Sequence, residues 1–390
     1  MKFCAIISEF NPFHNGHAYI IEQAKKIFNL PVLCLMSGDF VQRGEPAIVD
    51  KYTRATCAIS SGADMVIQLP TIYSLSSAQN FAQGSIKVLK DLGCTHLVIG
   101  VTHTNMEDYL SLAKIKNTNL KNAISSQLDN GTNYSKALIM VLKNKYPNCD
   151  KIFTDASNIL ALEYIGQNIK QNANLEIALV SRTDNGYNCE EIHSKTYANA
   201  TTIRKLIQEN NSNTTKKYIP TVCQHQLDNV VDRQIIEHIL FHNLRSATAQ
   251  QLNECYDYCE GLPYLINSAS QESNCLQEVI KISTSKRYRS ARIKKLCIYP
   301  TLGITKTAYN SIFRGKMIAK LLAIKSDCKP FISLFNKHHK KIIVSRNDYD
   351  NLTKSQKLSA DIDLRASNLY TLASKKPFNN DIKTGTLFIK

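Results

Sequence analysis

The chain has 390 residues, more than one typical domain holds, so we expect two domains. Hydrophobic residues make up 43% of the sequence and charged residues 21%, a balance that suits a globular protein and excludes a disordered one. No apolar run approaches the length of a membrane span, and the apolar start at residues 1–7 is too short for a signal peptide, so we expect a cytoplasmic protein. The 12 cysteines include no C-x-x-C pair, which favours reduced thiols over disulfides or a zinc site.

The net charge of +16 predicts a polyanionic partner. Basic residues are concentrated between residues 281 and 346, where 17 Lys or Arg accompany a single acid, Asp327. Aromatic residues are interspersed among them, and this mixture suits phosphate neutralisation combined with base stacking. We favour nucleic acid over a solvated basic surface, and over membrane lipid because the charge is not confined to one amphipathic stripe.

The first hundred residues alternate between apolar strands and helices. The expected strands are residues 3–8, 31–36, 64–69 and 96–99, and the expected helices are residues 16–28, 49–61 and 77–92. Continuous apolar strands separated by helices predict an α/β fold with a Rossmann-like parallel sheet covered on both faces. Such sheets bind ligands at the carboxyl ends of their strands, so the loops that follow these strands are the candidate site.

The chain beyond residue 100 is predicted to be mainly helical. The additional strands expected there are residues 175–180, 342–344 and 386–389. The polar, repetitive stretch at residues 209–215 indicates a domain boundary. We therefore expect an α/β domain over residues 1–217 and a basic, mostly helical domain over residues 218–390.

The strongest local signal is His14-Asn15-Gly16-His17, which follows the first strand and opens the first helix. Backbone N–H groups at a helix N-terminus favour anions, and Gly16 allows the backbone to approach a ligand closely. Two histidines three residues apart could both donate hydrogen bonds to phosphate oxygens whose charge grows as pyrophosphate leaves. His14 and His17 are therefore the predicted catalytic residues. A pair of surface histidines in a turn is the less favoured alternative, given the position after strand one.

This arrangement is similar to the signature of the HIGH-motif nucleotidyltransferases and class I aminoacyl-tRNA synthetases. The longer run at residues 9–17, with residues 36–38, 42–47 and 61–70, resembles the bacterial tRNA(Met) cytidine acetate ligase family. Further matching blocks extend the resemblance over nearly the whole chain: residues 157–160, 200–204, 260–262, 286–288 and 363–366. It implies a HIGH-type nucleotidyltransferase domain at residues 1–217 and a tRNA-binding domain after it.

The resemblance also implies a reaction. Acetate would attack the α-phosphate of ATP to give acetyl-adenylate and pyrophosphate. The N4 amine of the wobble cytidine of elongator tRNA(Met) would then take the acetyl group, giving N4-acetylcytidine. ATP is the implied substrate, with Mg²⁺ as its counter-ion and acetate and tRNA as partners; nothing in the sequence indicates an obligate protein partner.

The resemblance further implies which residues contact ATP. They are Ile7, Ser8, Glu9, Phe10, Asn11, Pro12, Phe13, His14, Asn15, Gly16, His17, Ile20, Gly100, Asn158, Arg182, Thr201, Thr202 and Arg204. For Asn158 and for the threonines a helix cap is an equally open interpretation, and for Arg182 a surface position is the less favoured one. The sequence departs from the family after Gly100, where residues 101–105 replace a Ser-Glu pair, so the contact around Gly100 is not defined.

Residues of the rim and of the basic segment complete the predicted site. Arg43 and Glu45 follow the second strand and would touch acetate or the target cytidine, although a salt-bridged loop is nearly as good an interpretation. Lys51 and Arg54 are weaker candidates for the same rim. The predicted contacts to RNA phosphates are Lys286, Arg287, Arg289, Arg292, Lys294 and Lys295. Of these, Arg289, Arg292 and Lys295 have the spacing of one helix face.

Two other functions are compatible with parts of the sequence. A small-molecule adenylyltransferase of the cofactor-synthesis type shares the chemistry of the histidine pair, and Asn11-Pro12 resembles its signature, but it needs no basic patch. A non-enzymatic RNA-binding protein with an inactive nucleotide fold would have no need of His14 and His17.

Overall fold

The structure is a computed structural model that describes residues 1–116, 134–143, 145–182, 196–337 and 341–390. Its strands are β1 (Cys4–Ser8), β2 (Val32–Ser37), β3 (Phe40–Val41), β4 (Glu45–Pro46), β5 (Met65–Leu69), β6 (His96–Val101), β7 (Glu176–Ser181), β8 (Ala319–Lys325), β9 (Ile342–Ile343) and β10 (Leu387–Ile389). The helices up to residue 217 are α1 (Asn15–Phe28), α2 (Lys51–Ser60), α3 (Thr71–Ser74), α4 (Ala78–Leu92), α5 (Met106–Lys116), α7 (Tyr134–Leu142), α8 (Cys149–Phe153), α9 (Ala156–Lys170), α10 (Ala200–Gln208) and α11 (Ser212–Lys216).

The later helices follow in the same order. They are η1 (Thr221–Asn229), α12 (Arg233–Ser246), α13 (Ala249–Glu254), α14 (Leu262–Glu272), α15 (Leu276–Ser283), α16 (Ser290–Leu302), α17 (Lys306–Arg314), η2 (Ser326–Cys328), α18 (Pro330–Phe335), η3 (Arg346–Tyr349), α19 (Lys354–Ala373) and α20 (Asn380–Thr384). No helix in the described ranges is long and apolar enough to cross a membrane.

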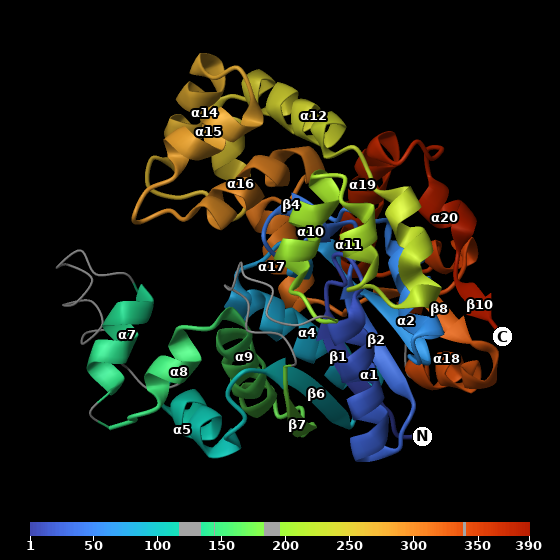
Figure 1. Ribbon diagram of the computed structural model, residues 1–390. Helices are drawn as coiled ribbons and strands as arrows, with labels where there is room; N and C mark the ends of the chain where they lie inside the picture. The colour runs from blue at the N-terminus through green and yellow to red at the C-terminus, as the bar shows by residue number, and fades with distance from the viewer. Residues whose placement is uncertain (117–133, 144, 183–195, 338–340) are drawn as a thin grey trace.

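The centre of the molecule is a sheet with the strand order β10-β8-β5-β2-β1-β6-β7, and β9 pairs with β8 (Figure 1). The five strands from β5 to β7 are mutually parallel, and Ile6 of β1 lies opposite Cys34 of β2 and Val98 of β6. The predicted α/β class with a parallel sheet is confirmed. The strand order places β1 beside both β2 and β6, so the loops after these strands meet at one edge.

The central strands are buried on both faces. In β1, Ala5 contributes to a core that includes Phe81 of α4 and Ala161 of α9. Its neighbour Ile6 contributes to a second core that includes Ile21 of α1, together with residues of α2. Successive side chains of a strand point to opposite faces, so each face needs its own covering helices and the strands read as continuous apolar runs.

The sequence pattern did not predict β8, which pairs antiparallel with β5. Its run Ala-Lys-Leu-Leu-Ala-Ile-Lys is buried through Ile324, and periodicity alone does not separate such a short apolar run from a buried helix segment. The division of the chain at residue 217 stays a prediction about folding units, but the sheet takes strands from both sides of it.

Helices α12 to α16 form a lobe at one side of the sheet domain, at the top of Figure 1. The lobe contacts the rest of the molecule through α16 and through α12, which packs against α19. The Tyr299 hydroxyl donates to the Leu75 carbonyl at 2.7 Å, and Lys295 Nζ donates to the Ser76 carbonyl at 3.0 Å. The lobe is thereby attached to the segment between α3 and α4, close to the carboxyl end of β5.

Candidate active site

A cavity of about 340 Å³ lies at the carboxyl ends of β1 and β6, between α1, α4, α9 and α10. Most residues predicted to contact ATP line it, and so does Arg43: Ile7, Ser8, Glu9, Phe10, Asn11, His14, Gly16, His17, Ile20, Gly100, Arg182 and Arg204. The other predicted ATP contacts lie outside its lining: Pro12, Phe13, Asn15, Asn158, Thr201 and Thr202.

The two histidines are oriented by the helix that they open. His14 caps α1 and its Nδ1 accepts a hydrogen bond from the Gly16 N–H at 3.1 Å, while His17 Nδ1 accepts one from the His14 N–H at 3.2 Å. The rings stack with their centroids 3.7 Å apart. Because each Nδ1 accepts a hydrogen bond, each neutral ring carries its proton on Nε2. The capping geometry therefore makes Nε2–H the donor of both rings.

The surroundings of His17 keep it neutral. Burial lowers the pKa of His17 well below its ordinary value, and His14 and Arg182 lower that pKa further. Its ring also packs against Phe10 and Phe13, with centroids 4.8 Å and 5.6 Å away. His17 is thus a fixed hydrogen-bond donor near pH 7 rather than a cation, as suits a group aimed at phosphate oxygens.

The loop after β1 is held by Arg54, which is fully buried on α2. Its Nη1 donates to the Glu9 carbonyl at 2.7 Å and to the Ser37 carbonyl at 3.0 Å, so it joins the loop after β1 to the end of β2. Lys51 is also buried and forms an ion pair with Asp39 at 2.9 Å. The prediction that Lys51 and Arg54 lie on the rim is wrong, because both side chains are used inside the protein.

Two segments from later in the chain fix the same loop. Arg204 Nη1 donates to the Asn11 carbonyl at 2.8 Å, and its Nη2 donates to Thr201 Oγ1 at 3.2 Å. Gln226 of η1 makes two hydrogen bonds with the main chain of Phe13, at 3.1 Å and 2.9 Å. The backbone of the loop is therefore positioned before any ligand binds.

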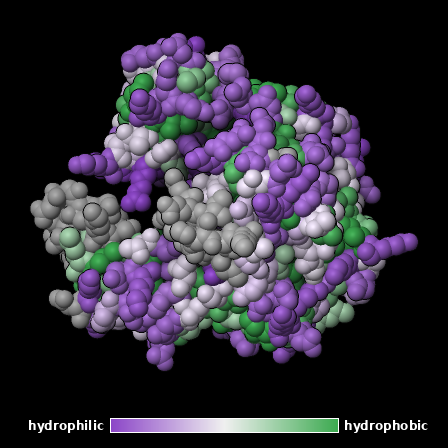
Figure 2. All heavy atoms as spheres, viewed as in Figure 1, coloured by the Kyte–Doolittle hydropathy of each residue, from purple (hydrophilic) through white to green (hydrophobic). Residues whose placement is uncertain are grey.

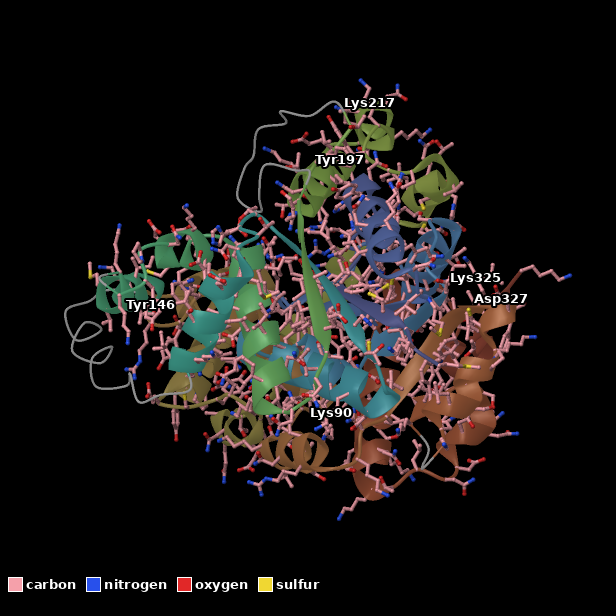
Figure 3. The ribbon with its side chains drawn as sticks, turned by 90° about the horizontal axis from the view of Figure 1, so that it is seen from below. Lys90, Tyr146, Tyr197, Lys217, Lys325 and Asp327 are labelled. Atoms are coloured by element: carbon pink, nitrogen blue, oxygen red, sulfur yellow. The ribbon has the colours of Figure 1, made fainter. Side chains whose placement is uncertain are left out.

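Other predicted ATP contacts serve to join segments. Asn15 Nδ2 donates to the Lys217 carbonyl at 3.0 Å, and Figure 3 shows Lys217 and Tyr197 at the same end of the molecule. Thr202 lies in the first turn of α10, where its N–H is capped by Asn199 Oδ1 at 2.9 Å. The interpretation of the threonines as helix caps is thus wrong, because the N-cap of α10 is Asn199.

Asn158 is fully buried, and its amide is engaged within the protein. Its Oδ1 accepts from the Thr102 N–H at 3.0 Å, and its Nδ2 donates to Thr102 Oγ1 at 2.8 Å and to the Lys151 carbonyl at 2.9 Å. The N-cap of α9 is Asp155, so the cap interpretation of Asn158 is also wrong. Asn158 instead holds the segment after Gly100, where the sequence departs from the family.

The rim loop between β3 and β4 is joined to the helical lobe. Glu45 pairs with Lys294 of α16 and with Arg233 of α12, the latter at 3.1 Å. Burial alone would raise the pKa of Glu45, but these two cations lower it below its usual value. Gly44 has φ 76°, and a Cβ there would lie 2.8 Å from the Lys295 backbone nitrogen. Glu45 is therefore part of a salt-bridged loop, as the alternative interpretation of the sequence predicted.

The spacing of Arg289, Arg292 and Lys295 predicted one helix face, but the structure does not place the three side chains together on an exposed face. Helix α16 begins after Arg289, and Lys295 is only 9% exposed. Arg292 donates two hydrogen bonds to the Asp257 carboxylate, at 2.8 Å and 2.9 Å. The exposed members of the predicted RNA set are in the loop before α16: Lys286, Arg287 and Arg289.

Sequence reasoning did not identify the apolar side of the cavity. This side is formed by Ala78 and Phe81 of α4 and by Leu160 and Tyr164 of α9. Apolar residues at helical spacing are typical of a core, so no pattern marks them as site residues. Figure 2 shows that hydrophilic side chains predominate on the visible face of the lobe.

Comparisons with known proteins show the family and the fold of the chain. A model of the family described as HIGH Nucleotidyl Transferase matches residues 1–384. The chain belongs to this family. It is 31% identical to the tRNA(Met) cytidine acetate ligase of Thermoanaerobacter sp. (strain X514), over 96% of each chain. It is also 31% identical to that of Clostridium novyi (strain NT), over 100% of each chain. The resemblance to this ligase family is confirmed.

Solved structures share the whole fold of this family member. The crystal structure of Thermotoga maritima TmcAL bound with alpha-thio ATP matches with a TM-score of 0.88, 22% identity and 100% coverage of both chains. The apo form of the same protein matches with a TM-score of 0.90. The lobe and the strand β8 are therefore parts of one shared architecture.

Proposed function

We propose that this protein is a cytoplasmic, ATP-dependent tRNA cytidine acetate ligase. It activates acetate as acetyl-adenylate and transfers the acetyl group to N4 of the wobble cytidine of elongator tRNA(Met). The observation that carries the proposal is the stacked pair His14–His17, whose Nδ1 atoms are both engaged in the cap of α1. Full-length similarity to relatives named tRNA(Met) cytidine acetate ligase supports the choice of substrates.

In the first step, the triphosphate of ATP lies against the N-terminus of α1. The Nε2–H groups of His14 and His17 donate to phosphate oxygens, and Arg182 and Arg204 on the cavity wall supply positive charge. Acetate attacks the α-phosphate and pyrophosphate leaves. Donors that are already oriented stabilise the charge that grows on the leaving oxygens without reorganising.

Mg²⁺ enters this proposal with the nucleotide. The described part of the chain contains no group of three or more His, Cys, Asp or Glu placed to hold a metal by itself. Mg²⁺ is commonly held by substrate phosphates and water with few protein ligands, so the triphosphate would supply its coordination. Its positive charge would add to that of the arginines on the cavity wall.

The tRNA would lie across the lobe and reach the cavity past the rim. The loop before α16 exposes Lys286, Arg287 and Arg289, and Tyr264 of α14 is 74% exposed. Exposed cations and aromatic rings suit phosphate contact and base stacking. Because Glu45 joins the rim loop to α16, a nucleic acid bound on the lobe is held close to the cavity.

Acetate-dependent exchange of labelled pyrophosphate into ATP tests the activation step. We expect exchange by the wild type and a loss of 10²–10³-fold or more in His14→Ala and His17→Ala, since each removes one donor to the developing charge. His238→Ala, an exposed histidine of α12, is the matched control and should exchange normally. Exchange that needs no acetate, or that survives both substitutions, would favour the small-molecule adenylyltransferase.

A further inference from the structure

One residue of the cavity has a charge opposite to the rest. Among the described residues that line it, Glu9 carries the only carboxylate, whereas Arg43, Arg182 and Arg204 carry positive charge. ATP and acetate are both anions, so a carboxylate in their pocket repels them. Its presence indicates a part of the cavity that receives a different kind of group, a hydrogen-bond donor.

The Glu9 side chain is held in a fixed place. Its Oε1 accepts a hydrogen bond from the Gln42 N–H at 2.8 Å, and its carbonyl oxygen accepts from Arg54. Since Gln42 precedes Arg43 in the rim loop, the carboxylate sits between the end of β1 and the rim. The rim is also the part of the site that is joined to the basic lobe.

One side of the cavity near Glu9 is apolar and suits a base. Tyr164 lines the same cavity, and burial, followed by the charge of Glu9, raises its pKa. The Tyr164 ring lies 6.4 Å from that of Phe81. With Leu160 and Ala78 they form the apolar side of the cavity. A planar pyrimidine with an exocyclic amine fits an apolar wall that has one carboxylate at its edge.

We propose that Glu9 contacts the N4 amine of the target cytidine and accepts its proton during acetyl transfer. The inference rests on the proposed function. The cytidine N4 attacks the carbonyl carbon of acetyl-adenylate, and a C–N bond forms. The proton moves from N4 to the Glu9 carboxylate, the C–O bond to the phosphate breaks, and AMP leaves with the electron pair. Glu9 then releases the proton to water.

The protonation behaviour of Glu9 is compatible with this role. Burial raises its pKa, and the Gln42 N–H and the guanidinium groups of Arg204, Arg43 and Arg54 oppose that rise. A carboxylate with a raised pKa is a better proton acceptor near neutral pH than an ordinary one. The ionisable groups that face it are these three arginines and Tyr164.

The test separates the two half-reactions in Glu9→Gln, whose amide oxygen can still accept from the Gln42 N–H. We expect single-turnover acetyl transfer to tRNA to fall by about 10²–10⁴-fold. Acetate-dependent pyrophosphate exchange should fall far less, because that step needs no proton acceptor at the cytidine amine. The wild-type transfer rate should rise with pH through an acid limb that the variant lacks. Glu22→Gln, an exposed acid of α1 with 57% of its side chain accessible, is the matched control.

Each outcome has a separate meaning. Transfer by Glu9→Gln at the wild-type rate would overturn the inference. A raised KM for ATP, with both half-reactions slowed equally, would also overturn it and assign Glu9 to the amine of adenine instead. A wild-type enzyme without acetate-dependent exchange would contradict the proposed function itself, whatever the variant does.

Discussion

At the residue scale, the position of one catalytic ring depends on the absence of a side chain two residues later. A Cβ at Gly16 would lie 3.0 Å from His14 Cε1 and 3.1 Å from His14 Nδ1. Either distance is at the limit of real Cβ contacts, so the imidazole would have to move. The ring is stacked on His17, and a shift of His14 would therefore disturb both donors.

Gly16→Ala should lower kcat of pyrophosphate exchange by about 10- to 100-fold, because a displaced ring no longer meets the phosphate oxygens. Gly166→Ala on α9 is the matched control, since a Cβ there meets nothing within 4 Å. The control should keep its activity and gain about 0.5–1 kcal/mol of stability. Exchange kinetics and thermal melting of both variants test these expectations. A normal kcat in Gly16→Ala would refute the role of Gly16 in positioning His14.

The depressed pKa of His17 predicts a pH-dependent stability. Below pH 6.5 the unfolded chain binds a proton at this position that the folded protein does not bind, so the contribution is complete above pH 6.5 and is lost as the pH falls. Between pH 7.5 and 5.5 the wild type should lose about 1 kcal/mol more stability than His17→Gln. Melting temperatures at three pH values measure this difference. An identical acid response of wild type and variant would be inconsistent with a neutral His17 ring in the folded protein.

The histidine pair could be predicted from sequence because its signal is local. Two histidines spaced by three, placed between a strand and a helix, fix both their position and their chemistry. Arg54, Gln226 and Asn158 could not be assigned in this way, since their partners are 45, 213 and 56 residues away in the chain. The sequence reveals the residue type of such a side chain, but not the distant backbone group with which it forms a hydrogen bond.

At the element scale, the buried basic residue of α16 and the exposed basic residues of the loop before it have different roles. Lys295 and Gly44 make the close contact between the lobe and the rim, while the loop before α16 stays exposed. The sequence alone therefore could not separate a buried lysine such as Lys295 from the exposed basic residues that can contact RNA. The same ambiguity hid β8, because a short apolar run fits a buried strand and a buried helix equally well.

Burial lowers the pKa of Lys295 to about 8. In the folded protein the charged form of Lys295 is disfavoured by burial. Below pH 8 the residue is charged in both the folded and the unfolded state, so it lowers the free energy of unfolding by its full amount. This destabilisation decreases as the pH rises from 8 towards 10.5. Lys295→Met should therefore be more stable than wild type at pH 7 by about 1–3 kcal/mol, and the advantage should shrink at pH 10. Melting curves at both pH values measure it, and a destabilised variant at pH 7 would contradict this account.

The exposed and buried basic residues should differ in RNA binding. Lys286→Ala with Arg289→Ala should weaken tRNA binding and reduce the slope of log K against log salt by about two, one for each lost phosphate contact. Lys295→Met should leave the slope unchanged. Binding titrations over a range of salt concentrations measure both. A slope that responds to Lys295 rather than to the exposed pair would reverse the assignment.

At the scale of the whole molecule, the C-terminal segment completes the sheet domain. Asp381 of α20 is buried and pairs with Lys51 of α2 at 2.9 Å and with Lys320 of β8 at 2.8 Å. These two cations, against the opposing effect of burial, hold the pKa of Asp381 far below its usual value. Residues far apart in the chain, on α2, β8 and α20, therefore share one buried ionic cluster.

Asp381→Asn should destabilise the protein by about 3–5 kcal/mol, because it leaves two buried cations without their common anion. Since β8 belongs to the central sheet, loss of secondary structure and loss of exchange activity should shift to lower temperature together. Asp350→Asn, at an exposed position, is the control. Separate transitions, with activity surviving the first, would instead favour two independent folding units.

The proposed ligase joins acetate to a cytidine of tRNA at the expense of ATP. The direct measurement incubates it with ATP-Mg²⁺, labelled acetate and an elongator tRNA(Met) transcript, followed by nucleoside mass spectrometry. We expect labelled N4-acetylcytidine at the wobble position, dependent on ATP and absent with the His14→Ala His17→Ala variant. Unlabelled tRNA, from folded protein that still binds ATP, would rule out the ligase function and favour a small-molecule adenylyltransferase.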